Sequence, residues 1–438
     1  MQKYINIIGL EIHIEPNTKS KMFCSCPQDH FGAKPNTQTC PICLGLPGAL
    51  PYANKEAIKK TIKLGLALGS KISEKSKFYR KHYFYPDLPK GYQISQKDNP
   101  FCVGGSLMSK KINHIHLEED AGKLIHSGDE SLIDFNRSGC ALIEIVTEPV
   151  FNNVSEVLSF VKELQLIARY LDISNADMEK GTMRLEANIS LKALLGGGRM
   201  DSREVGNLPD YKVELKNINS FKFLEKALKA EIERQTKALD NSEKLKQETR
   251  GYDEKTKTTF SQRTKTDSDD YRYFPEPDIS PINSTEYIVH STKIPELPQA
   301  KRDRFMDMYK LPKDYVEILI SDLERANYFE QAVKLAPDLT KSIADLMINK
   351  NMDNEYPEPA GFVKKIVELT KIEYASTSDL EQAIKDVLFE NPNIVDSYIN
   401  GKGQVIGFLI GQVQKVLQGK GDPKMINVKL IESLQKNI

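Results

Sequence analysis

The chain has 438 residues, more than the roughly 100–200 expected of one domain, so we expect two or three domains. Lys and Arg number 61 and Asp and Glu also number 61, so nucleic-acid binding would have to come from local basic patches. The apolar stretches are far shorter than the roughly 20 residues that span a bilayer. Met1 leads into strand-like sequence without a signal or transit peptide. We therefore expect a soluble cytoplasmic protein without a membrane partner.

The front of the chain predicts β-strands separated by turns and interrupted by helices. Apolar and polar residues alternate, as in half-buried strands, in segments 10–15, 112–118, 142–148, 183–191 and 212–216. Helical spacing of apolar residues predicts helices after Asn54, from about Ser155, and over roughly Ser220–Leu239. Strands that follow one another in sequence favour an α+β fold with a mostly antiparallel sheet.

Beyond residue 293 nearly all of the sequence predicts helix. Segments 299–311, 313–335 and 338–350 carry apolar residues at helical intervals, and 351–359 is typical of a linker. We expect an α+β catalytic domain over 1–293, an all-α domain over 294–352 and a helical tail over 353–438. Residues 401–438 contain six Lys against only Asp422 and Glu432, so this end of the tail is a candidate phosphate-contacting surface.

Four cysteines form the strongest metal signal in the sequence. Cys24 and Cys26 precede a loop rich in Pro, Gly and Asn, which is followed by Cys40 and Cys43. Two such pairs within 22–46, a zinc knuckle, can close a tetrahedral thiolate site around Zn²⁺. Four protein ligands leave no open position, so this zinc would be structural. Four unrelated buried thiols, or a cytosolic disulfide, are the less favoured alternatives.

Acidic residues interrupt several of the predicted strands. Glu11 and His13 share one face of a strand, and Glu144 breaks an apolar run. Buried carboxylates need a partner, and Mg²⁺ prefers oxygen ligands and bridges to phosphates. The alternative is solvated strand faces with surface ion pairs. Further candidates on these strands are Glu118, Glu119, Asp120, Glu186, Asn188, Glu214 and Lys216.

Basic and aromatic residues alternate in the segment 79–87. Arg80 and Lys81 could hold phosphates while Tyr83 or Tyr85 stacks on a base, although a packed aromatic turn would look the same. The sequence contains no phosphate-binding P-loop, no dinucleotide fingerprint and no nucleophile elbow. If the chain handles ATP, it therefore does so through metal and carboxylates, and any ammonia must come from elsewhere.

Many segments resemble, in order, the B subunit family of the aspartyl/glutamyl-tRNA amidotransferases. In the first 300 residues they are 8–15, 79–87, 92–96, 116–123, 134–139, 142–146, 184–190, 214–220 and 269–278. The resemblance resumes at 407–412 and 419–424. It implies a cradle-like catalytic domain followed by a helical domain and tail. Here the tail looks shortened between Lys371 and Ser378, which affects tRNA binding more than catalysis.

The resemblance implies an ATP-dependent carbon–nitrogen ligase with glutamine as the amide donor. The side-chain carboxylate of Glu on tRNA(Gln), or of Asp on tRNA(Asn), would be phosphorylated and then amidated by ammonia. An amidase A subunit would supply that ammonia, and a small C subunit would complete a heterotrimer. The alternative is a non-catalytic, zinc-stabilised adaptor that binds tRNA.

The resemblance also implies roles for individual residues. Mg²⁺ and phosphate would be held by Glu11, His13, Glu119 and Glu144. Lys81 and Tyr83, with Glu119, would lie where ammonia arrives. Strand parity puts Glu119 on the face opposite His114 and His116, so we expect a bulge or a strand end there. The ATP pocket would be lined by Glu186, Asn188, Glu214 and Lys216, and Cys24, Cys26, Cys40 and Cys43 match the zinc-bearing branch of the family.

Overall fold

The computed structural model describes residues 3–194, 208–264, 271–291, 293–370, 375–399, 403–417 and 420–435. The chain divides into two compact units, Met1–Met308 with Ile320–Leu323 and Tyr309–Leu319 with Glu324–Ile438. The first unit is α+β and the second is helical, as the sequence predicted. The division into three domains stays a prediction.

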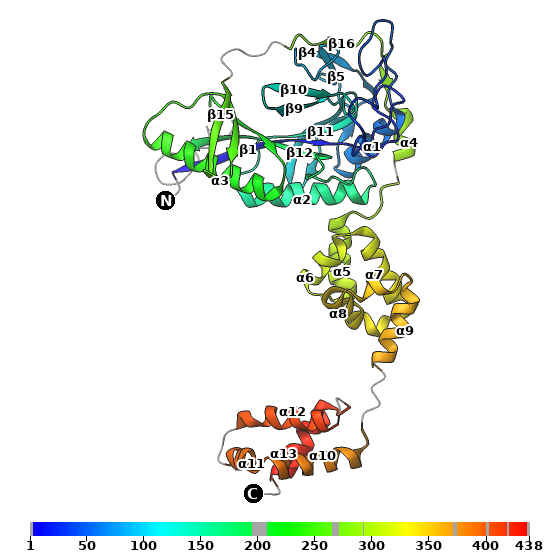
Figure 1. The fold of residues 1–438 in the computed structure, drawn as a ribbon, viewed down its shortest axis with the longest axis vertical. Helices are drawn as coiled ribbons and strands as arrows, with labels where there is room; N and C mark the ends of the chain where they lie inside the picture. Colours follow the sequence, from blue (N-terminus) through cyan, green and yellow to red (C-terminus); the bar gives the residue numbers. More distant parts are fainter. Residues whose placement is uncertain are drawn as a thin grey trace. The chain divides into compact units, whose positions relative to one another are not determined.

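A large twisted sheet forms the centre of the first unit (Figure 1). Every strand pair in it is antiparallel except β13 with β14. In order across the sheet the strands are β15 (Thr258–Thr264), β14 (Glu248–Asp253), β13 (Val213–Ile218), β12 (Met183–Ala193), β1 (Tyr4–Ile14), β11 (Ala141–Thr147), β8 (Lys110–Glu119), β6 (Cys102–Val103) and β2 (Lys71–Ile72), with β7 (Ser106–Leu107) beside β8. The five strands expected from the sequence are therefore present.

One face of this sheet is apolar and is covered by helices. Even-numbered residues of β1, such as Leu10 and Ile12, are buried in the main core, and α2 (Val154–Tyr170) and α3 (Phe221–Asp240) run along this side (Figure 1). Side-chain oxygens of Asn153 and Ser220 cap the two helices. The apolar face therefore fixes which side of each strand is left for polar residues.

The other face of the sheet carries the polar residues and lies under smaller elements (Figure 1). These are the hairpin β9 (Lys123–Ser127) and β10 (Glu130–Asp134), and a three-stranded sheet of β16 (Phe274–Pro275), β4 (Tyr79–His82) and β5 (Tyr92–Ser95). Helix α1 (Lys55–Ala67) begins at the predicted cap Asn54 and packs beside α4 (Thr285–Ser291). The remaining strands of the unit, β3 (Lys75–Ser76) and β17 (Ile282–Asn283), pair with each other.

The rear of the chain is helical wherever the structure describes it. Its elements are α5 (Pro298–Tyr309), α6 (Lys313–Ile320), α7 (Leu323–Leu335), η1 (Pro337–Leu339), α8 (Thr340–Lys350), η2 (Met352–Glu355) and α9 (Pro359–Thr370). The segment 313–335, predicted as one helix, breaks at Ser321 and Asp322; Ser and Asp are residue types that favour turns over helix interiors. A turn of 3₁₀ helix occupies part of the expected linker.

The tail has a small core of its own, to which Leu380, Leu409 and Leu430 contribute. It comprises α10 (Thr377–Glu390), α11 (Pro392–Ile399), η3 (Gly403–Val405), α12 (Ile406–Val416) and α13 (Pro423–Gln435). Residues 371–374, where we expect the shortening, lie outside the described residues. In the described part of the chain, no helix combines the length and the apolar character needed to cross a membrane.

Candidate active site

Strand register alone brings the polar residues together. His13 of β1 lies opposite Glu144 of β11, and Glu144 lies opposite His116 of β8. Two residues before His13 on β1, Glu11 lies opposite Glu186 of β12, which is the other neighbouring strand of β1. Side chains that are paired across neighbouring strands point to the same face. The acids therefore line one side of the sheet, opposite the helices.

His13 and Glu144 form the centre of an acidic cluster. The Nε2 atom of His13 lies 3.4 Å from Glu144 Oε2 and 3.4 Å from Glu118 Oε1. The Nε2 atom of His116 lies 3.2 Å from Glu144 Oε2. Potential ligand atoms of Glu11, His13 and Glu144 lie within 4.8 Å of one another. This spacing suits a single small cation surrounded by oxygen and nitrogen donors.

The electrostatics of the cluster show an excess of carboxylates. Burial, reinforced by the charges of Glu144 and Glu186, raises the pKa of Glu11 to about 7. Burial opposes ionisation of Glu144 too, but His116 and His13 outweigh it and hold its pKa well below the usual range. A divalent cation would relieve the repulsion that shifts Glu11.

A second set of ligand atoms adjoins the first through Glu11. Carboxylate oxygens of Glu11, Glu186 and Glu214 also lie within 4.8 Å of one another. The Nζ atom of Lys216 lies 2.8 Å from Glu186 Oε2 and 3.5 Å from Glu214 Oε1. The Oδ1 atom of Asn188 is buried on the same face and makes no hydrogen bond within the described residues. The sheet thus offers an oxygen-rich surface that its own side chains do not fully satisfy.

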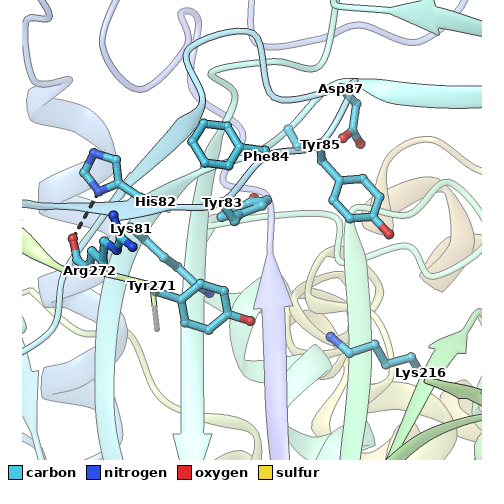
Figure 2. Close-up of a pocket in the computed structure, with 10 residues that line it drawn as sticks. Lys81, His82, Tyr83, Phe84, Tyr85, Asp87, Lys216, Tyr271 and Arg272 are labelled. Atoms are coloured by element: carbon cyan, nitrogen blue, oxygen red, sulfur yellow. Dashed lines mark hydrogen bonds between the residues drawn. The ribbon is translucent and has the colours of Figure 1, made fainter. Parts of the chain in front are cut away.

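A cavity of about 700 Å³ opens beside this cluster (Figure 2). Lys216, which pairs with Glu186 and Glu214, lines one side of this cavity, and aromatic side chains line the other side. Tyr83 and Tyr271 meet edge to face with ring centroids 6.2 Å apart, and Lys81 Nζ lies 4.9 Å from the Tyr271 ring centre. The remaining lining residues are His82, Phe84, Tyr85, Asp87, Ala121 and Arg272.

Lys81 is a half-buried cation that faces the acids. Burial would lower its pKa, but the charges of Glu118 and Glu144 outweigh burial and raise it above the usual value. For Lys216, the charges of Glu186 and Glu214 likewise outweigh burial and raise the pKa. Both ammonium groups therefore stay charged, and both can receive an anionic group placed in the cavity.

The four knuckle cysteines gather at a separate place in the same unit. Their sulfur atoms lie within 4.8 Å of one another, and none forms a disulfide. Hydrogen bonds from Cys24, then the backbone of Cys40 and the charge of Lys21, lower the pKa of Cys43 to about 5 against the effect of burial. This all-sulfur donor set fits Zn²⁺, which takes four thiolates in structural sites.

Comparisons with known proteins agree on one family. Residues 6–290 match the GatB/GatE catalytic domain and residues 318–434 match the GatB domain. Over 487 residues, the chain is 40% identical to the B subunit of the aspartyl/glutamyl-tRNA(Asn/Gln) amidotransferase of Thermodesulfovibrio yellowstonii, covering 99% of this chain and 100% of that relative. The chain belongs to this B subunit family. The resemblance found in the sequence is therefore confirmed.

Other family members match over a similar extent. The B subunit of the Persephonella marina enzyme is 40% identical over 98% of this chain and 99% of the relative. That of Thermotoga maritima is 41% identical over 99% of each chain. These alignments extend over 481 and 488 residues, more than the 438 of this chain, so the relatives contain segments without a counterpart here.

Glu119 is the expected ligand that the structure does not bring to the cluster. Its Oε1 atom accepts a hydrogen bond of 2.8 Å from the backbone N–H of Ile94 and pairs with Lys90. The strand β8 ends at Glu119, as one of the two expected possibilities required, but it pairs there with β11 without a bulge, so parity turns Glu119 away from Glu118. The structure therefore does not bring Glu119 to Glu11, His13 and Glu144, and Glu118 lies beside His13 instead; a ligand role for Glu119 stays a prediction.

The structure brings two further residues to the cluster: His116, to which the sequence analysis gave no role, and Glu118, which it named only among the further acidic candidates. His116 and Glu118, together with Glu144, form another group of potential ligands. His114, His116 and Glu118 follow one another at intervals of two residues along β8, and residues two apart in a strand share a face. This spacing was the signal in the sequence that could have placed His116 and Glu118 together. Tyr271 and Arg272 belong to the segment 269–278, whose first two residues lie outside the described part of the chain. Only the tertiary fold brings them beside Lys81.

Proposed function

We propose that the chain is the B subunit of a glutamine-dependent tRNA amidotransferase and carries out the activation step. It would phosphorylate the side-chain carboxylate of Glu-tRNA(Gln), Asp-tRNA(Asn) or both. The observation that carries the proposal is the gathering of Glu11, His13, Glu118 and Glu144 on one sheet face beside a basic and aromatic cavity. Family membership supports the same reaction.

The acidic cluster fits Mg²⁺ by its donor chemistry. Carboxylates surround His13 at 3.4–3.8 Å, and burial, together with the charges of Glu144 and Glu186, raises the pKa of Glu11 to about 7. We propose that Glu11, His13, Glu118 and Glu144 hold the ion, with Glu186, Asn188, Glu214 and Lys216 around the nucleotide phosphates. Magnesium would supply charge neutralisation for the phosphoryl group.

The reaction then needs little covalent chemistry from the protein. A carboxylate oxygen of the tRNA-linked amino acid attacks the terminal phosphorus of ATP, and ADP leaves. Ammonia then attacks the activated carbonyl carbon, inorganic phosphate leaves, and the amide remains on the tRNA. Lys81 and Lys216 are placed to hold developing negative charge, while Tyr83 and Tyr271 can stack on a base or ribose.

The proposal also includes partner subunits and a second metal with a structural role. We propose that ammonia comes from an amidase A subunit acting on glutamine and that a small C subunit completes the complex. We place the arrival of ammonia at Lys81 and Tyr83, on the aromatic side of the cavity. Zn²⁺ would bind Cys24, Cys26, Cys40 and Cys43 in a structural role.

A non-catalytic tRNA adaptor is not favoured. An adaptor needs a surface that attracts phosphate, whereas the face described above is lined by carboxylates that repel it in the absence of a metal. The half-buried Lys81 facing those acids also has no evident role in an adaptor that only binds tRNA.

Substitution of Glu144 tests the proposal. In the full complex, Glu144→Gln should lower Mg²⁺-dependent ADP formation with misacylated tRNA by at least about a hundredfold, because it removes a charge that contacts both histidines. Binding of tRNA should change little. Glu130→Gln, at the exposed first residue of β10, is the matched control.

Two results would contradict the proposal. Undiminished phosphoryl transfer by the Glu144→Gln variant would show that the site is misplaced. A wild-type complex whose ATP hydrolysis is not stimulated by misacylated tRNA would leave only the adaptor function.

A further inference from the structure

Lys21 is a lysine with no exposed surface. Its relative exposure is 0%, which is rare for a side chain whose end carries a full positive charge. The residue lies three positions before Cys24, at the base of the cysteine knuckle. Nothing in the activation reaction proposed above uses it.

The ammonium group of Lys21 has only neutral oxygen partners and one sulfur. Its Nζ donates hydrogen bonds of 2.8 Å to the backbone oxygens of Gln38 and Ser138. The third contact is Cys43 Sγ at 3.9 Å. Within the described residues no carboxylate forms an ion pair with Lys21, although ion pairs elsewhere in this unit are numerous.

A buried cation without an anion is one of the most unfavourable features a protein can contain. Two carbonyl dipoles compensate an ammonium only in part. If the knuckle held four neutral thiols, Lys21 would have no counter-charge. Four thiolates around one divalent cation, in contrast, carry a net negative charge. Contacts of the N–H···S type stabilise these thiolates in metal sites.

We infer that Lys21 is the internal counter-ion of the cysteine knuckle and that it stabilises a thiolate-bound divalent metal through Cys43. This inference rests on the zinc site proposed above. Because all four donors are sulfur, the site should prefer a soft divalent cation, and Zn²⁺ is the first candidate.

The same lysine connects the knuckle to the catalytic sheet. Besides Cys43 it contacts the backbone of Ser138, whose hydroxyl donates to the Cys43 carbonyl over 3.3 Å. The next residue, Gly139, accepts a hydrogen bond of 2.9 Å from the backbone N–H of Met22. Residues 138–139 lead into β11, the strand of Glu144. Loss of metal should therefore loosen this connection as well as the knuckle.

Zinc retention tests the inference in the full chain without reference to activity. The wild-type protein should contain one zinc ion per chain by elemental analysis. Lys21→Met, which keeps most of the side-chain volume but removes the charge, should release zinc to the chelator 4-(2-pyridylazo)resorcinol at least about tenfold faster. Lys19→Met, two residues away and exposed, should match the wild type.

The outcomes separate the two ideas. If the wild-type chain contains no bound zinc and takes up none, the zinc site is wrong and the inference fails with it. If the wild type holds zinc and folded Lys21→Met releases it at the wild-type rate, Lys21 is not the counter-ion although the zinc site stands.

A double-mutant cycle distinguishes a counter-ion from a purely structural lysine. In a Cys43→Ser background the anion is already lost, so adding Lys21→Met should no longer lower the urea midpoint and should raise it. If Lys21 only holds the carbonyls of Gln38 and Ser138, the substitution should lower the midpoint equally in both backgrounds. This comparison also decides the matter if Lys21→Met alone fails to fold.

Discussion

Glu118, Glu119 and Asp120 follow one another in the sequence and end in three different surroundings. Glu118 joins the acidic cluster and Glu119 pairs with Lys90 on the opposite face. Asp120 is 6% exposed and pairs with Arg184 and Arg137. Successive side chains in a strand point to opposite faces, which separates Glu118 from Glu119, and Asp120 lies beyond the end of β8.

The ion pairs of Asp120 make stability depend on pH in a defined direction. Burial would raise the pKa of Asp120, but Arg137 and Arg184 outweigh it and lower the pKa below its usual value. The stabilisation is therefore fully present above the unfolded-state pKa of about 3.9 and is lost as the pH falls through the folded-state value.

Asp120→Asn should lower the free energy of unfolding at pH 7 by about 3 kcal/mol, because it leaves two partly buried guanidinium groups without their anion. The variant should also lose less stability than the wild type between about pH 5 and pH 2. Urea unfolding at several pH values measures both effects. Asp129→Asn, in the exposed turn of the β9–β10 hairpin, should behave as the wild type, and equal pH slopes for all three proteins would refute the prediction.

Among elements, the knuckle loop packs directly on the lysine that pairs with Glu119. Gly45 has φ +66°, and a Cβ atom there would overlap the Cγ atom of Lys90. The side chain of Lys90 is only 7% exposed, so it has little room to move aside. The knuckle therefore helps to hold the Lys90–Glu119 pair beneath the catalytic face.

Gly45→Ala measures this packing. Alanine in the left-handed region costs about 1 kcal/mol, and the overlap with Lys90 should add about 2 kcal/mol. Gly32→Ala is the matched control, since Gly32 has φ +69° but no atom within 4 Å of the added Cβ. Thermal or urea unfolding that gives equal losses for the two variants would show that Lys90 is not held by the knuckle.

Single elements also show how far the sequence could predict the site. The parity of β1 placed Glu11 and His13 together, and the apolar neighbours of Glu144 indicated a buried strand before any fold was known. Glu119 could not be placed in the same way, because the family resemblance and strand parity disagreed. The observed register decided in favour of parity.

At the scale of the whole molecule, we expect catalysis and tRNA binding to draw on different parts of the chain. The front unit supplies the acidic face, while residues 401–438 carry an excess of Lys. Lys420 and Lys424 are exposed in the described part of this segment. Phosphate contacts by lysine release counterions, so their contribution weakens as salt rises.

Reversal of these two charges should weaken tRNA binding and make it less dependent on salt. For Lys420→Glu with Lys424→Glu, the slope of log affinity against log salt should become shallower by about 1–2, roughly 0.9 for each lost phosphate contact. Filter binding or fluorescence anisotropy measures this slope. The control is Lys364→Glu with Lys385→Glu, at exposed positions of the segment 353–400, in which acidic residues outnumber basic ones. If the two double variants show the same salt slope, residues Lys420 and Lys424 do not contact phosphate.

The sequence by itself determined the α+β class, the helical rear, the cysteine knuckle as a group and the family. These follow from local patterns, since alternation, helical spacing and paired cysteines all operate over a few residues. The tertiary structure decided what depends on strand register and on contacts between distant segments. It placed Glu118 rather than Glu119 in the acidic cluster. It also brought Tyr271 next to Lys81 and buried Lys21 next to Cys43. Burial and electrostatic pairing depend on three-dimensional distance, which no short-range pattern contains.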